Sequence, residues 1–153
     1  MKRTFLVLGV AGVLTYSVPI IPVEAVSSPN PQTIMTESQT RAAGLITRYS
    51  ISVSSSSNKV CINGAIVTNS KMKSIGYKNI SIDYSPDKVN WYKEKSLDDL
   101  LKSDSNSYYL NNYMVSVKGG YYYRISCTHY AKESGLFGSS QSVNNTSNSV
   151  WID

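Results

Sequence analysis

The sequence has very little of the chemistry that most enzymes and metal proteins use. Its 153 residues include one histidine, His129, and two cysteines, Cys61 and Cys127. One histidine excludes paired-histidine zinc motifs, and two cysteines without a CxxC spacing exclude a zinc-ribbon site. The chain also lacks a GxSxG elbow and the glycine-rich loops that cradle phosphates. We therefore predict a protein that is not an enzyme and that has no catalytic residue, metal or cofactor.

The sequence also has few charged residues and few cysteines. Only 16% of the residues are charged, the formal net charge is +5, and the basic residues form no run of five or six. This pattern predicts solvated faces and no nucleic-acid partner, although a mild positive charge favours anionic walls or headgroups. A disulfide-dense scaffold is excluded, and the 41% hydrophobic content excludes a wholly disordered chain.

The first 25 residues have the pattern of a secretory signal peptide. Lys2 and Arg3 precede an apolar run over residues 5–14, and Val23 and Ala25 supply the small residues of a cleavage site. An uncleaved membrane anchor is the alternative. The pattern predicts a secreted protein, with retention at the cell surface as an alternative, that touches the membrane only transiently through its signal peptide.

The rest of the chain divides into a leader and one domain. Residues 26–43 are rich in Ser, Pro and Thr and predict a flexible leader. Residues 44–153 contain short β-rich runs separated by turn residues, which predicts an all-β domain, an antiparallel β-sandwich of about seven strands like those of immunoglobulin or fibronectin type III domains. The expected strands cover residues 45–54, 59–68, 77–84, 89–93, 113–118, 121–130 and 148–153.

One short helix is expected near residues 96–102. Ser96 is a suitable N-cap, Asp98 and Asp99 would lie in the first turn, and leucines follow at helical spacing.

The predicted strand at residues 121–130 suggests a binding surface. Its odd positions are apolar enough to face the core, so Tyr122, Arg124 and Tyr130 should lie along the outer face. Aromatic rings and a guanidinium group could stack on sugar rings or on a partner. The alternative is ordinary cross-strand pairing on a solvated face.

Export would place Cys61 and Cys127 in an oxidising compartment, where a disulfide between them is the natural expectation. Strand alternation opposes it, because inward-facing Val60 and Ile62 would turn Cys61 outward while Cys127 points inward. A bulge at Asn63-Gly64 would reconcile the two cysteines. The sequence is compatible with a disulfide and with two free thiols.

Two segments carry a resemblance to a known family. They are GYYYRI at residues 120–125 with THY at residues 128–130, and MKSIGYKNISI at residues 72–82 followed by Trp91. Over most of residues 41–153 the chain resembles a family of small secreted proteins of Gram-positive bacteria described as a domain of unknown function. The resemblance implies bacterial origin and export and brings no activity or ligand. The two cysteines depart from the family's pattern.

Together these features favour a non-enzymatic, secreted binding module associated with the cell envelope. Its expected partner is a cell-wall polymer, a glycan or a surface protein. A secreted antagonistic peptide or toxin is the alternative, suggested by the small size, positive charge and many tyrosines. A small secreted hydrolase is the third hypothesis.

Overall fold

The computed structural model describes residues 44–153, so the predicted signal peptide and leader lie outside the described residues. Within this range the protein consists of strands and turns, and no helix is long and apolar enough to span a bilayer. The strands are β1 (Ile46–Ser55), β2 (Lys59–Ser85), β3 (Tyr92–Leu97), β4 (Leu100–Ser116), β5 (Tyr121–Lys132), β6 (Ser140–Thr146) and β7 (Val150–Ile152). The all-β prediction is confirmed.

β1 and β2 form the hairpin that the sequence predicts. Ser57 adopts a positive φ of 43° in the connecting turn, and Ser55 pairs with Val60 directly beside that turn. Val53 and Val60 point their side chains into the core. Local turn chemistry and alternation are sufficient to specify this hairpin.

β2 is a single strand of 27 residues and pairs with four of the other strands. One of its edges pairs with β1 and then β5, while the other pairs with β4 and then β3. Register shifts interrupt the pairing, and Asn79, with a φ of 50°, lies at one of them. Such bulges bend a strand, so the segments expected at residues 59–68 and 77–84 are two halves of one bent strand.

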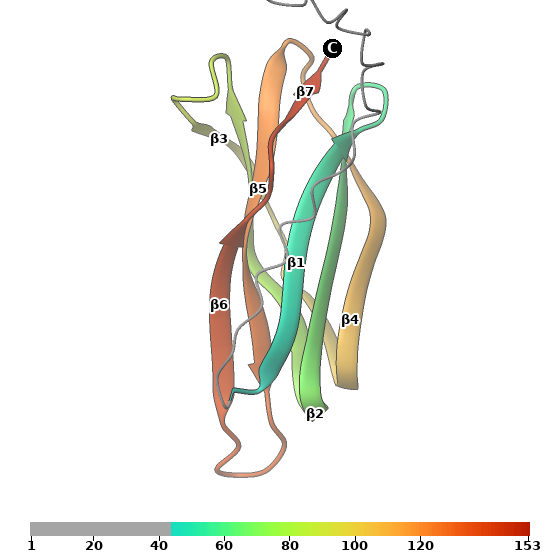
Figure 1. Ribbon diagram of the computed structural model, residues 1–153, viewed down its shortest axis with the longest axis vertical. Helices are drawn as coiled ribbons and strands as arrows, with labels where there is room; N and C mark the ends of the chain where they lie inside the picture. Colours follow the sequence, from blue (N-terminus) through green and yellow to red (C-terminus); the bar gives the residue numbers. More distant parts are fainter. Residues whose placement is uncertain (1–43) are drawn as a thin grey trace, which may run out of the picture. The chain divides into compact units, whose positions relative to one another are not determined.

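The seven-stranded antiparallel sheet curls into a half-barrel, so that β1 also contacts β5, β6 and β7 (Figure 1). Side chains of Gln141 and Asn148 form hydrogen bonds to the backbone of β1. Gln141 Oε1 accepts a hydrogen bond from Ile46 N at 2.8 Å, and the Asn148 amide binds both N and O of Val53 at 3.0 and 2.9 Å. The edge of β1 is therefore blocked against other strands.

The helix expected near residues 96–102 does not exist. Leu97 pairs with Ile80 and Leu100 with Tyr77, so β3 and β4 follow the same edge of β2 with only Asp98 and Asp99 between them. The sheet edge offers these residues backbone partners and apolar contacts that one helical turn cannot match, so tertiary pairing overrides the local capping signal.

β6 lies between the strands expected at residues 121–130 and 148–153, where the sequence predicts no strand. It pairs with β5 from Ser126 to Lys132. Its hydroxyl and amide side chains bond across the pair, as in the 2.8 Å bond from Thr128 Oγ1 to Asn144 Oδ1. A polar strand of this kind has no hydrophobic alternation to reveal it.

Candidate functional site

The alternation predicted for β5 is confirmed. Odd positions from residue 123 to residue 131 are buried, whereas the even positions face outward and are half-buried. The predicted binding residues Tyr122, Arg124 and Tyr130 therefore share the outer face of one strand. Their environment was not predicted, because each is held by side chains that come from other strands and turns.

Arg124 lies between a carboxylate and an indole. Its Nε is 3.5 Å from Oδ2 of Asp83, which lies opposite on β2, and its guanidinium carbon is 4.2 Å from the centre of the Trp91 ring. About a third of the Arg124 side chain is exposed. The guanidinium thus lies over the face of the indole, while part of it can still reach a ligand.

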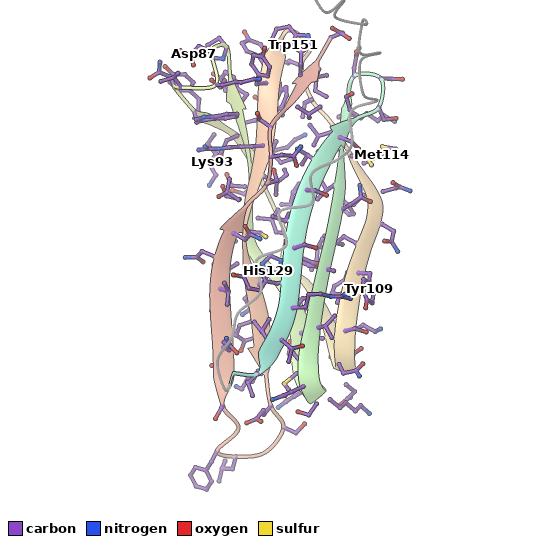
Figure 2. All side chains as sticks on the ribbon, in the orientation of Figure 1. Asp87, Lys93, Tyr109, Met114, His129 and Trp151 are labelled. Carbon is purple, nitrogen blue, oxygen red and sulfur yellow. The ribbon has the colours of Figure 1, made fainter. Side chains whose placement is uncertain are left out.

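Tyr122 packs against an indole and an ammonium group. Its ring meets that of Trp151 edge to face, with centroids 4.8 Å apart, and Nζ of Lys88 lies 4.4 Å from the centre of the Tyr122 ring. Trp151 is 41% exposed and lies at the end of the sheet formed by β3 and β7 (Figure 2). We call Lys88, Trp91, Tyr122, Arg124 and Trp151 the aromatic face.

Two residues of the aromatic face, Lys88 and Trp91, lie in the turn between β2 and β3. Oδ1 of Asp87 accepts hydrogen bonds from the backbone N–H groups of Val89 and Asn90 at 2.8 Å, and these bonds hold the pKa of the carboxyl well below its usual range. Trp91 Nε1 donates to the Lys88 carbonyl at 3.0 Å. This Asp-centred turn therefore fixes Lys88 and Trp91.

Tyr130 forms a separate contact farther along β5. Nζ of Lys78 lies 4.1 Å from the centre of its ring. Tyr130 lies eight positions after Tyr122, which corresponds to roughly 25 Å along a strand. Ser126 and Thr128 occupy the positions between them and hydrogen-bond to β6. The outer face of β5 is thus a long strip with aromatic and cationic groups at both ends.

No protein-family model, curated protein or solved structure matches the chain. The resemblance stated above therefore depends on its sequence motifs alone.

His129 lies in the core between β1 and β5 (Figure 2). Its ring is 5.1 Å from both the Tyr49 and the Tyr77 rings, and Nε2 donates to the Ser50 carbonyl at 3.1 Å. Nδ1 is buried without a well-formed hydrogen bond within residues 44–153. Desolvation lowers the pKa of the imidazole, although the Ser50 and Val143 backbone groups oppose the shift.

Both cysteines are buried as free thiols. Cys127 belongs to the core cluster, and burial raises its pKa to about 12. Cys61 lies outside that cluster, and its Sγ is 3.4 Å from Oδ1 of Asn112. Since Val60 and Ile62 are both buried in the core, Cys61 occupies the opposite face of β2.

This placement makes a thiol count informative. A bridge to Cys127 would need Cys61 on the core side of β2, and a one-residue slip would expel Val60 and Ile62. We expect two free thiols per chain when protein purified without reductant is unfolded and treated with a thiol reagent. In the folded protein both thiols should react slowly, because both are buried. Finding no free thiol after unfolding, in protein that runs as a monomer on a non-reducing gel, would contradict this placement and indicate a disulfide between Cys61 and Cys127.

Within residues 44–153, no three His, Cys, Asp or Glu side chains come together as a metal site requires. The sequence predicted that Tyr122, Arg124 and Tyr130 share the outer face of β5, but it did not indicate that Trp91 and Trp151 contact two of them. The signal for Trp151 was its aromatic character, but its pairing with Tyr122 depends on β7 joining β5, which no local pattern indicates.

Proposed function

We propose that the chain is an exported, non-enzymatic binding module and that the outer strip of β5 holds an extended, anionic polymer of the cell envelope. The single observation that carries the proposal is the aromatic face, where Arg124 and Lys88 each lie over an aromatic ring. Both of the chain's tryptophans lie in it.

The chemistry of the strip suits a glycan-based polymer. Exposed ring surface can pack on the apolar faces of sugars, and the cations can pair with phosphate or carboxylate groups. The stacked rings and cations are already ordered, so binding would cost little side-chain entropy. Because the groups are spread along a strand, a long polymer can contact more of them at once than a small molecule can.

The position of His129 supports a binding role over a hydrolytic one. The imidazole is fully buried, and its Nε2 is occupied by a backbone carbonyl. A general base must reach the proton of a bound nucleophile, which this side chain cannot do from the core.

A two-layer, immunoglobulin-like sandwich is part of the same proposal. The packing of β1 across the core from β5 supports it, since Tyr49 meets His129 there. The 27-residue β2, which pairs with strands on both sides of the core, is not typical of that fold.

Binding to isolated bacterial cell walls tests the function. We expect Tyr122→Ala and Arg124→Ala each to weaken retention on walls about tenfold, because each removes a stacked pair from the aromatic face. Arg124→Lys should recover only part of the affinity, since an ammonium group keeps the charge but loses the planar stacking.

The matched control is Tyr109→Ala, which removes a tyrosine that is 48% exposed on β4, away from the outer face of β5 (Figure 2). Thermal unfolding of all variants separates lost binding from lost folding. Equal retention of wild type, Tyr122→Ala and Arg124→Ala by the same walls would remove this surface from consideration.

A further inference from the structure

The loop between β5 and β6 extends past the ends of the neighbouring strands, at the opposite end of the sheet from β3 and β7 (Figure 1). Backbone bonds at its base fix its path. Glu133 N donates to Ser139 O at 2.9 Å, Ser139 N donates to Oε2 of Glu133 at 3.1 Å, and Gly138 N donates to Gly135 O at 3.3 Å. The loop therefore presents its tip in a defined position.

Two large apolar side chains occupy that tip. Leu136 is 91% and Phe137 is 94% exposed, which makes them the most exposed large hydrophobic residues of the described part of the chain. A pair of adjacent apolar side chains held out into water at a loop tip gains nothing for folding. Exposed apolar groups of this kind mark contact sites with proteins or membranes.

Lysines surround the base of the loop. Lys132 ends β5 and pairs with Ser74, and Lys73 precedes Ser74 on β2. Lys102 on β4 pairs with the next β2 residue, and exposed Lys71 lies two positions before Lys73. The acidic residues of the same region are Asp104 and Glu133, and the carboxylate of Glu133 accepts the loop bond described above. The end of the sheet is therefore net positive.

We propose that this loop docks on an anionic lipid surface, with Leu136 and Phe137 entering the interfacial region and the lysines contacting the headgroups. The charge around the loop complements anionic headgroups, each lysine adding electrostatic attraction. Two side chains are too small a patch for a specific protein interface, which needs about 20 or more residues on each side. A lipid interface needs no matching pocket, and it accepts a Phe and a Leu from a small apolar tip.

This proposal goes beyond the binding of a wall polymer, since it uses the opposite end of the sheet and a different ligand. It also extends the sequence-based expectation, under which only the signal peptide touches the membrane. The two proposals fail separately, because substitutions in the aromatic face leave the loop intact and substitutions in the loop leave the aromatic face intact.

Tryptophan reporters test insertion at the tip itself. Full-length Phe137→Trp is mixed with vesicles of equal parts phosphatidylglycerol and phosphatidylcholine, and its emission is compared with that of Val89→Trp. Val89 is 78% exposed in the turn between β2 and β3, at the other end of the sheet. We expect a blue shift and quenching by brominated lipid for Phe137→Trp only. Both proteins have the same N-terminal segment, so binding to the vesicle through that segment would change the emission of the two reporters alike. An equal change in emission for the two reporters would overturn the proposal.

Sedimentation with the same vesicles measures the contribution of each group. The double variant Leu136→Ser and Phe137→Ser should bind at least tenfold more weakly, since it loses the apolar contact. Lys73→Gln with Lys132→Gln should also weaken binding and reduce its salt dependence. Equal binding of the loop variant and the wild type, or equal binding to vesicles of pure phosphatidylcholine, would overturn the proposal, as would capture of the tip by a protein with no change on vesicles.

Discussion

Replacing Gly76 with alanine should lower the free energy of unfolding by about 3 kcal/mol or more, which we expect to be the largest effect of any single methyl group added to this protein. Gly76 pairs with Leu101 on one side and with Tyr130 on the other. A Cβ at this position would overlap the backbone carbonyl oxygen of Leu100, which cannot rotate away as a side chain could. The clash must push β4 off β2 at the bend of the sheet.

Gly120→Ala provides the control, and urea unfolding measures both variants. Gly120 has a φ of 86°, but a Cβ there would meet no atom within 4 Å. Its replacement should cost about 1 kcal/mol from the backbone conformation alone. The difference between the two variants therefore isolates the collision with Leu100. If Gly76→Ala cost no more than Gly120→Ala, β2 and β4 would not approach each other as the structure shows.

Local sequence signals predicted one hairpin and the two faces of one strand. The β1–β2 hairpin follows from its serine-rich turn, and the two faces of β5 follow from simple alternation. In both cases the turn or the two-residue period specifies the structure without information from distant parts of the chain. The outward direction of Tyr122, Arg124 and Tyr130 was predictable for the same reason.

Two elements that depend on partners elsewhere in the sheet were predicted wrongly or missed. The leucines and aspartates near residues 96–102 match a helix, but β2 offers them an open sheet edge. β6 is polar throughout its outer face and forms because β5 lies beside it. The expected number of seven strands agrees with the structure although two of the expected strands merge into β2 and β6 replaces a loop.

Some contacts of the aromatic face could be predicted from local sequence, and others depend on the folded sheet. Tyr122 and Arg124 come from one strand, so a pattern within ten residues brought them together. Trp91 and Trp151 come from a turn and from the last strand, and only the folded sheet places them beside β5. Contacts across 30 residues of sequence cannot be inferred from period alone, because the register of β2, β3 and β7 determines them.

Acidification from pH 7 to pH 5 should destabilise the protein through His129. Burial lowers the pKa of this imidazole in the folded state, while in the unfolded chain it is about 6.5. The unfolded state therefore binds more protons in this range, so stability is complete above about pH 6.5 and falls as the pH decreases below it. Because one proton is involved, the free energy of unfolding changes by at most about 1.4 kcal/mol per pH unit.

Other groups contribute little in this window. Carboxyl groups titrate mainly below pH 5, and the pKa values of Cys127 and Tyr77, which also lie in the core, are raised by burial, so both stay neutral. His129→Gln removes the titrating group, so its unfolding free energy should change less between pH 7 and pH 5 than that of the wild type, whatever its own stability.

NMR of the wild-type protein measures the titration of the His129 imidazole directly and needs no variant. Because His129 is the chain's single histidine, its imidazole signal needs no assignment by mutation. The ring lies between Tyr49 and Tyr77 with its Nε2 proton on the Ser50 carbonyl, so the folded protein should show no histidine titration near pH 6.5. An imidazole that titrates at pH 6.5 or above in the folded protein would mean that this ring reaches water, and the interior between β1 and β5 would then have to be open.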